Sequence, residues 1–277
     1  MTSRTCSYCG ENLAVGLRWC PHCARPSLFP NVDLAAASEE TEALAQRYQA
    51  QVERAKAEGK EAALAKFEQH VSESCACKGM PRWELERLVA SDTATAATYY
   101  QQIDGRSRIP DDNRWDRLRR IADAAFFQAL GEDIHFAALS TDGRWLSTYG
   151  DGAVFFKEDM ISHRATVFEK NTATWVEDNG ALQIPPGHRA VWSQRSHLAV
   201  AKLGEAACEE PCDMGSLLLS CGPSSADDAF MEVHIFGGFT IRSASAVVLR
   251  RGALSELGRA DVLDRTKRLG ISVTEVP

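Results

Sequence analysis

The sequence predicts an α+β protein with a small cysteine-rich module at its N-terminus, a helical middle region and a small mixed sheet in its C-terminal half. Three observations support this prediction. Four of the nine cysteines lie within the first 23 residues, helix-forming residues dominate the stretch that follows, and short β-branched or aromatic runs separated by glycine turns begin near Ile134. We expect the module at 1–26, a linker and stalk helix at 31–78, a helical region at 79–131 and an α+β domain at 132–277.

The N-terminal cysteines form two Cys-x-x-Cys pairs, Cys6 with Cys9 and Cys20 with Cys23, separated by a ten-residue spacer. Four thiolates at this spacing can surround one zinc ion as a closed tetrahedron, with bonds of about 2.3 Å and no open position for a substrate. His22 lies between two cysteines that would already point at the metal, so we do not expect it to be a ligand. A segment this short cannot bury enough apolar surface to fold unaided, so zinc binding should supply its folding free energy.

The segment resembles the short zinc ribbons found at the ends of many bacterial proteins. Such ribbons bind nucleic acid, protein or no further partner, so the resemblance implies a structural zinc ion and no specific activity. Between Met1 and Pro26, three arginines and one glutamate give a charge of +2, which the −2 of a zinc ion with four thiolates cancels.

The whole chain has 277 residues, of which 44% are hydrophobic and 25% charged, as is typical of globular proteins. Its formal net charge of −7 argues against attraction of nucleic acid to the whole surface. No apolar run is long enough to cross a bilayer and no signal sequence is present, so we expect a cytoplasmic protein without a membrane partner. The five cysteines outside the ribbon cannot all pair with one another, which favours a reducing compartment.

Residues 34–71 are rich in helix-forming residues and carry a thin apolar stripe, which predicts a long stalk or packing helix. Gly59 interrupts the pattern and marks a kink or a break into two helices. A dimeric coiled coil is the alternative, although the stripe is rich in alanine and its heptads are irregular. The stripe consists of Leu44, Tyr48, Val52, Ala55, Ala63, Phe67 and Val71.

Cys75 and Cys77 end this stretch as a Cys-x-Cys pair, which could bind a second metal ion together with Cys208, Cys212 and Cys221. Free cysteines are also common as small buried residues, so both interpretations stay open.

Further helices are predicted at 83–89 and 93–102, followed by the clearest amphipathic pattern in the chain, which begins at Asp111 or Asp112 and ends at Gly131. Six arginines surround the start of this helix. They could hold the phosphates of a nucleic acid, but a solvated surface of Asp–Arg pairs is the more common explanation. The arginines are Arg106, Arg108, Arg114, Arg117, Arg119 and Arg120.

From residue 134 onward, the pattern predicts short strands and turns mixed with helices, without a regular βαβ repeat. The helices are expected at 171–176, 189–203 and 262–269. The strands are expected at 134–139, 145–149, 153–157, 165–169, 217–220, 230–236, 246–250 and 271–276.

The chain contains no P-loop, Gly-x-Gly-x-x-Gly, Gly-x-Ser-x-Gly or His-Glu-x-x-His motif, which argues against a nucleotide kinase, a Rossmann enzyme, an α/β-hydrolase and a zincin. The predicted strand at 230–236 is more informative. Because side chains alternate along a strand, Glu232 and His234 project from one face and Val233 and Ile235 from the other.

This strand, Glu232-Val-His-Ile-Phe-Gly, together with the turn, strand, helix and strand that follow it, is similar to the C-terminal end of bacterial ADP-ribosyltransferase-like toxin and phage-associated domains. The tract from Tyr149 through Arg164 to Asn171 resembles the middle of such domains. The resemblance covers about half of the chain, from Ile134 to Pro277.

The resemblance implies an NAD-consuming transferase, in which a strand glutamate holds a ribose hydroxyl and steadies the cationic sugar that forms as nicotinamide leaves. Glu232 matches that position. His135 matches an early-strand residue that anchors the cofactor, and Ser140 joins these two as a candidate catalytic residue. A carboxylate on a rigid strand can present a fixed negative charge to such a sugar. The candidate NAD-binding residues are His135, Thr141, Tyr149 and Arg164.

The chain departs from that family's pattern, because it lacks a clean Ser-Thr-Ser strand and has Glu232-x-His234 in place of Glu-x-Glu. An inactive version of the domain is therefore one alternative. Another is a non-enzymatic zinc-ribbon adaptor that binds a protein or a nucleic acid through the arginine-rich helix. Under either hypothesis, the sequence does not identify the macromolecular acceptor or partner.

Overall fold

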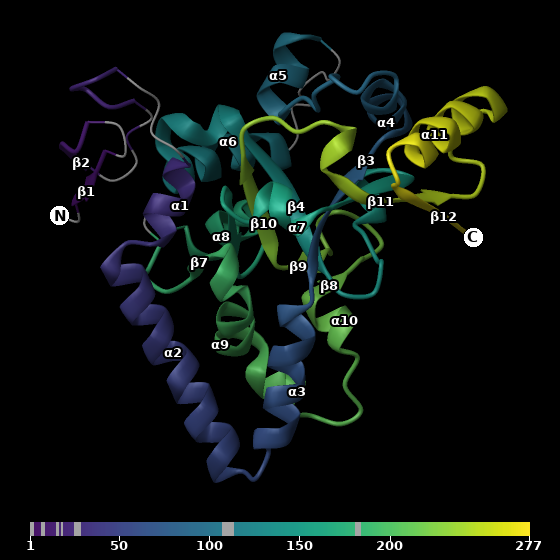
Figure 1. Ribbon diagram of the computed structural model, residues 1–277. Helices are drawn as coiled ribbons and strands as arrows, with labels where there is room; N and C mark the ends of the chain where they lie inside the picture. The colour runs from purple at the N-terminus through teal and green to yellow at the C-terminus, as the bar shows by residue number, and fades with distance from the viewer. Residues whose placement is uncertain are drawn as a thin grey trace.

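The computed structural model describes residues 3–6, 9–14, 17, 19–24, 29–106, 114–180 and 184–277. Within these residues the fold is α+β, as the sequence predicts. Helices cover both faces of one large mixed sheet, and the cysteine-rich module lies to one side of it (Figure 1).

Eight strands form the large sheet in the described part of the chain. The last third of the chain contributes strands at the edges of the sheet as well as strands in its interior. Its order is β12–β11–β5–β3–β4–β10–β6–β7, and every neighbouring pair is antiparallel except β11 and β12. In chain order these strands are β3 (Cys75–Met80), β4 (Ile134–Ser140), β5 (Gly152–Phe156), β6 (Ala165–Phe168), β7 (Arg189–Val191), β10 (Glu232–Phe236), β11 (Ala244–Arg250) and β12 (Ser272–Val276).

Four predicted elements of the C-terminal half are wrong in type or start. The strand expected at 217–220 is helical up to Leu218, and the helix expected at 262–269 already begins at Glu256. The stretch 145–149 is a loop that ends in the short 3₁₀ helix η2 (Ser147–Tyr149), because the Trp145 indole donates to the Gly150 carbonyl at 3.0 Å and closes a local turn. The helix expected at 189–203 instead begins with β7, and α9 (Arg195–Ala207) starts only after the 3₁₀ turn η3 (Trp192–Gln194).

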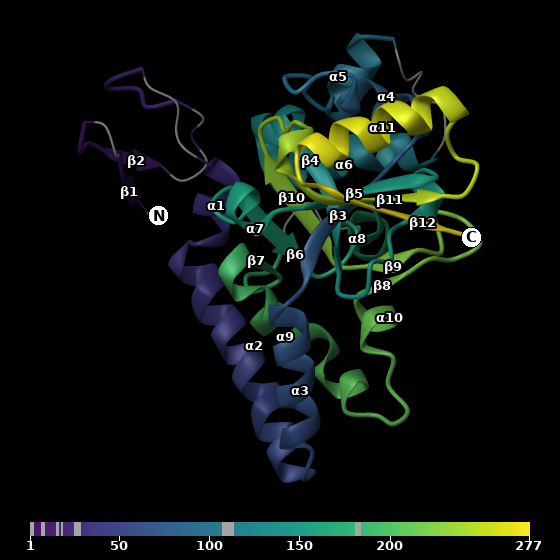
Figure 2. The same cartoon turned by 45° about the vertical axis from the view of Figure 1, so that its right-hand side comes forward.

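The N-terminal part consists of the hairpin β1 (Ser3–Thr5) and β2 (Asn12–Ala14), then α1 (Pro30–Ala35) and a helical hairpin. The helical hairpin pairs α2 (Ser38–Ala57) with α3 (Glu61–Ser72), and it breaks at Gly59 as predicted. Helix α9 packs against both of these helices, so the apolar stripe is buried in the core of its own chain (Figures 1 and 2). That packing covers the surface a coiled-coil partner would need.

The remaining helices cover the two faces of the sheet. On one face, α4 (Arg82–Val89) and α11 (Glu256–Arg268) join α3 and α9 in the main apolar core. On the other, α6 (Arg114–Phe127) and α8 (Thr172–Asn179) pack over β4 and β6. The caps predicted for α6, Asp111 and Asp112, lie outside the described residues. The shorter elements are α5 (Tyr99–Asp104), α7 (Glu158–Ile161), α10 (Met214–Leu218), η1 (Gln128–Asp133), η4 (Ile241–Ser243), β8 (Leu219–Ser220) and β9 (Ala229–Phe230).

Strand β3 was not predicted, yet it lies in the middle of the sheet between β5 and β4. Its sequence, Cys-Ala-Cys-Lys-Gly-Met, has small residues and no β-branched ones, so it carries little strand propensity of its own. A side chain at Gly79 would place its Cβ 2.7 Å from the Leu146 carbonyl oxygen, which explains why a residue unfavourable in strands stands there.

Strands β3 and β4 diverge after a short paired segment. They pair from Cys75 with Ser140 to Cys77 with Ala138. Beyond that point, β3 continues beside β5 alone and β4 beside β10 alone. We call the gap between residues 78–80 of β3 and 134–137 of β4 the fork. Because neither edge has a neighbouring strand there, the fork is where a ligand can enter the sheet.

Candidate functional site

The four predicted zinc ligands come together in the N-terminal module. The sulfur atoms of Cys6, Cys9, Cys20 and Cys23 all lie within 4.8 Å of one another, with 3.8 Å between Cys6 and Cys23 and 3.6 Å between Cys9 and Cys20. Sulfurs on a tetrahedron with zinc bonds of about 2.3 Å would lie about 3.8 Å apart. The donor set therefore fits a zinc ion. A closed site of four sulfurs has no free position, which makes its role structural.

The five other cysteines do not form a second metal site. In the described chain no other group of three metal-binding side chains converges. The Cys75 thiol donates to the Ser140 carbonyl and the Cys77 thiol to the Arg144 carbonyl. Cys208 and Cys221 likewise donate to backbone carbonyls, those of Lys60 and Trp145.

A cavity of about 390 Å³ occupies the fork. This is within the range of about 300–1,000 Å³ that is usual for small-molecule sites. Successive residues of a strand point to opposite faces, so the cavity receives Phe136 and Ala138 from one face of β4 and His135 and Ala137 from the other. It therefore passes through the sheet.

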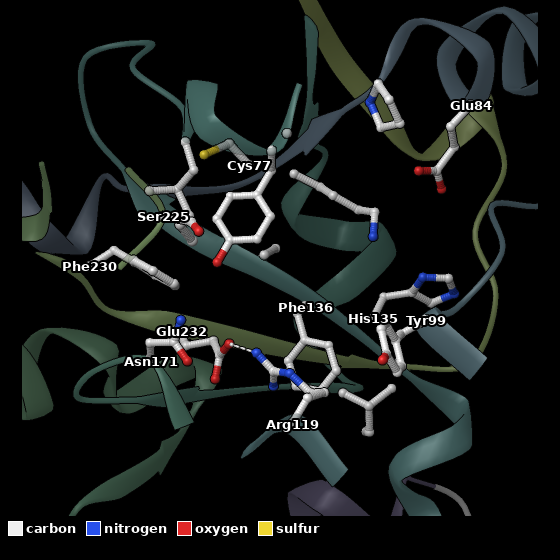
Figure 3. Close-up of a pocket in the computed structure, with 18 of the residues that line it drawn as sticks. Cys77, Glu84, Tyr99, Arg119, His135, Phe136, Asn171, Ser225, Phe230 and Glu232 are labelled. Atoms are coloured by element: carbon white, nitrogen blue, oxygen red, sulfur yellow. Dashed lines mark hydrogen bonds and ion pairs between the residues drawn. The ribbon is translucent and has the colours of Figure 1, made fainter. Parts of the chain in front are cut away.

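The cavity has two ends, which carry different polar groups. Figure 3 shows Glu232 and Asn171 on one side, His135 and Tyr99 on the other, and Phe136 between them. The Glu232 end consists of Arg119, Tyr149, Asn171, Phe230 and Glu232. The Glu84 end consists of Lys78, Trp83, Glu84, Tyr99, Gln102 and His135. Two large aromatic side chains among these, Tyr149 and Trp83, are 43% and 39% exposed, so the cavity is open to solvent.

Glu232 is only 1% exposed, yet it lines the cavity. Its Oε1 accepts from Nη2 of Arg119 at 3.2 Å, while Oε2 accepts from the Thr172 backbone N–H at 2.9 Å and lies 3.1 Å from Nε2 of His234. Burial alone would raise the pKa of this carboxyl, but the Arg119 charge and the hydrogen bonds of His234 and Thr172 lower it to about 2. Glu232 is therefore an anion at neutral pH, fixed by three groups.

Arg119 is the partner that fixes Glu232 from helix α6. Its Nη1 also donates to Oγ1 of Thr172 at 2.9 Å and lies 3.5 Å from Oδ1 of Asp123. The centre of its guanidinium group lies 4.0 Å from the centroid of the Phe136 ring, a favourable cation–π geometry. Asp123 in turn accepts from the Tyr100 hydroxyl at 2.9 Å. A chain of polar contacts therefore runs from α5 through α6 to β10.

The sequence did not single out Arg119, because it stands among six arginines that look like a solvated surface. The signal that could have found it is its spacing. Arg119, Asp123 and Phe126 follow one another at intervals of four and three, which places them on one side of the helix. The amphipathic pattern of this helix also predicts that Ile121 is buried, but its side chain is 44% exposed.

His135 and Glu84 are the buried polar residues of the other end. His135 is 1% exposed, and neither ring nitrogen has a hydrogen-bond partner in the described structure. Burial, together with the charges of Lys78 and Arg164, holds its pKa well below the usual range, so the ring is neutral. Glu84 is 2% exposed, and its Oε1 likewise lacks a partner. Unpartnered buried polar groups are rare in folded proteins, and two of them at one end of a cavity point to a ligand.

The other candidate site residues occupy different places. Tyr149 lines the Glu232 end. Ser140 is 1% exposed at the closed side of the fork, and neither it nor Thr141 lines the cavity. Nη1 of Arg164 donates to the three consecutive carbonyls of residues 236–238, which makes it a support of the turn after β10. The cavity thus receives Glu232 and Tyr149 at one end and His135 at the other, while Ser140, Thr141 and Arg164 do not line it.

The structure describes four of the six arginine side chains in the predicted basic patch. Arg106, Arg117 and Arg120 are exposed, whereas Arg119 faces the cavity. Arg108 and the side chain of Arg114 lie outside the described residues. Binding of a partner through these arginines stays a prediction.

Comparison with models of protein families and with curated proteins finds no match for this chain. The cavity has to be interpreted from its own chemistry. A search of the described helices finds none with the length and apolar character that crossing a bilayer requires.

Proposed function

We propose that the protein binds NAD at the Glu232 end of the cavity and consumes it, releasing nicotinamide and transferring ADP-ribose to an acceptor. The observation that carries the proposal is Glu232 itself, a carboxylate held ionised and immobile on the wall of an open cavity. The aromatic rings of Phe136, Tyr149 and Phe230 beside it offer apolar surfaces for the nicotinamide ring.

In the proposed reaction, the bond between the ribose anomeric carbon and the nicotinamide nitrogen breaks. The electron pair leaves with nicotinamide, so positive charge develops on the ribose. A carboxylate that is already ionised and already in place stabilises this charge without having to reorganise. Such preorganised electrostatic stabilisation is usually the largest contribution to catalysis. The acceptor, or water, then adds to the anomeric carbon and loses its proton.

Arg119 contributes to the same end in two ways. It holds Glu232 in position, and it lines the cavity as a cation. A guanidinium group has five N–H donors, of which Glu232, Thr172 and Asp123 engage only part, so the rest are suited to a diphosphate oxygen. The cavity end thus combines a cation for an anionic linker with an anion for a cationic sugar.

The test is release of nicotinamide from NAD by the zinc-loaded full chain, followed by chromatography. Glu232→Gln keeps the shape of the side chain and removes its charge, and we expect the rate to fall by about 10²–10³-fold. Glu169→Gln is the matched control, since Glu169 is also buried at 4% exposure and ion-paired with Arg47 but does not line the cavity. It should cleave NAD at the wild-type rate.

Equal rates in wild type and Glu232→Gln would contradict the proposal, and so would a wild-type protein that neither binds nor cleaves NAD. Thermal melting of each variant separates a loss of chemistry from a loss of fold.

A further inference from the structure

We propose that the Glu84 end of the cavity binds a guanine base. Lys78 from β3, Glu84 from α4 and His135 from β4 line this end, together with Trp83 and Tyr99. This ligand is independent of NAD at the Glu232 end, because it rests on residues that the proposed reaction does not use.

The first step concerns the two buried groups without partners. Glu84 Oε1 and both ring nitrogens of His135 have no hydrogen-bond partner in the described chain. Burying a polar atom without a partner costs free energy, and a carboxylate costs more than a neutral group. A ligand that donates N–H groups to Glu84 would remove this cost. A neutral histidine offers it one further donor and one further acceptor.

The second step concerns charge. Lys78 lines the same end, but its ammonium group does not satisfy Glu84 Oε1. The end therefore presents one separate cation and one separate anion. A cationic ligand would be repelled by Lys78 and an anionic one by Glu84. The end therefore favours a ligand without net charge that offers hydrogen-bond acceptors to the ammonium group and N–H donors to the carboxylate.

The third step is shape. Trp83 and Tyr99 are flat aromatic side chains, and base–aromatic stacking favours a planar ring between or against them. Lys78 and Glu84 come from different elements, so their ligand must carry acceptors and donors on separate edges. In Figure 3, Glu84 lies on one side of this end of the cavity, and His135 and Tyr99 lie on the other.

Guanine satisfies all three requirements. Its O6 and N7 are acceptors of the kind that lysine ammonium groups bind, while N1–H and the 2-amino group are adjacent donors for a carboxylate. Adenine has no O6 acceptor, and its N1 accepts where guanine donates, so Glu84 would oppose it. The pattern of groups therefore selects guanine over adenine.

The test is isothermal titration calorimetry of the zinc-loaded full chain with guanosine, inosine and adenosine. Guanosine should bind. Inosine lacks the 2-amino group and should bind about 5–10-fold more weakly, and adenosine about 50-fold or more weakly, because one paired edge contact discriminates to about this extent.

Variants assign the preference to its residues. Glu84→Gln should weaken guanosine binding about tenfold or more and erase the difference between guanosine and inosine. It should not unfold the protein, since it removes an unpartnered buried charge. Lys78→Met should weaken guanosine and inosine alike, because both keep O6 and N7. The matched control is Glu86→Gln on the same helix, whose carboxylate pairs with Arg82 at 2.9 Å and does not line the cavity.

Absence of guanosine binding at millimolar concentration would overturn the inference. So would equal affinity for guanosine and adenosine, or a Glu84→Gln protein that still prefers guanosine to inosine. None of these outcomes depends on whether the protein cleaves NAD, so the two proposals fail separately.

Discussion

Glu232 and Asp123 are two buried carboxyl groups that contact the same arginine and yet ionise differently. Burial raises the pKa of both. For Glu232, the Arg119 charge and the hydrogen bonds of His234 and Thr172 overcome burial and lower the pKa to about 2. For Asp123, burial and the Glu232 charge outweigh Arg119 and the Tyr100 hydroxyl, and the pKa rises to about 6. Arg119 thus holds Glu232 ionised, but its single positive charge does not also keep the pKa of Asp123 low.

The raised pKa of Asp123 predicts a pH-dependent contribution to stability. A folded-state pKa of about 6 against an ordinary value of 3.8 means that the folded protein binds this proton more tightly, so the contribution is present at low pH and is lost as the pH rises through 6. The free energy of unfolding of wild type minus that of Asp123→Asn should fall by about 1.4 kcal/mol between pH 5 and pH 7.5. Urea titrations followed by tryptophan fluorescence measure it.

Asp178→Asn is the control for this measurement, because Asp178 is exposed and its ion pair is with Lys170 at the surface, not with a buried group. The free energy of unfolding of wild type minus that of Asp178→Asn should stay constant over the same pH range. A flat difference for Asp123→Asn as well would show that Asp123 is ionised in the folded protein at pH 5.

At the residue scale, the sequence predicts what is local. The zinc ligands follow from spacing within 23 residues, and the common face of Glu232 and His234 follows from strand alternation. Arg119 and Glu84 could not be predicted in the same way. Each lies on a helix among other charged residues, and only the packing of that helix onto the sheet turns one of them inward.

At the scale of elements, the fork is the feature that creates the site, and β3 creates the fork. Neither could be predicted, because the strand has weak propensity and is held by partners far along the chain. The other central strands contain β-branched or aromatic residues, and the sequence predicts them close to their observed bounds. Which strands pair with each other is not encoded in the residues of any one strand, so the position of β3 in the sheet could not be predicted.

Gly150 holds one arm of the fork in place, and its substitution should be costly. A Cβ at this position would lie 2.0 Å from the Met80 carbonyl oxygen and 2.6 Å from the Pro81 nitrogen, both backbone atoms that cannot move independently. We expect Gly150→Ala to destabilise the protein by about 3 kcal/mol, at the upper end for overpacking. Urea unfolding measures the loss.

The matched control for Gly150 is Gly238→Ala. A Cβ there meets nothing closer than the Thr95 side chain at 3.7 Å, which is ordinary contact. It should change stability by less than about 0.5 kcal/mol. A Gly150→Ala protein as stable as Gly238→Ala would mean that the β3 arm can shift without cost.

At the scale of the whole molecule, the zinc module and the sheet have separate cores. Among the described residues of the module, Cys6, Leu13 and Cys20 are buried, and they form a cluster apart from those of the sheet. The α+β class and the clustering of the four N-terminal cysteines could be predicted, because each depends on a local sequence pattern. The order of strands could not, since it depends on contacts between distant segments.

Removing zinc should therefore unfold the module and spare the sheet. With a strong chelator, we expect the loss of one zinc ion per chain, proteolytic trimming of the residues before α1, and a shift of less than about 2 °C in the melting of the remainder. Metal analysis, proteolysis and calorimetry measure these three effects. Cys20→Ser should bind no zinc, whereas Cys221→Ser, at an exposed cysteine outside the cluster, should bind it normally. A melting loss shared by the whole protein would contradict this separation.

The place of β3 in the sheet also bears on how the chain is made. Cys75 is synthesised 65 residues before Ser140, to which its thiol donates. At about 5–20 residues per second, a nascent β3 waits roughly 3–13 s for that neighbour, with both edges bare. Its lysine, its glycine and its lack of β-branched residues make it a poor template for other chains during that interval. We therefore expect the weak strand propensity of β3 to reduce aggregation of the unfinished chain during synthesis.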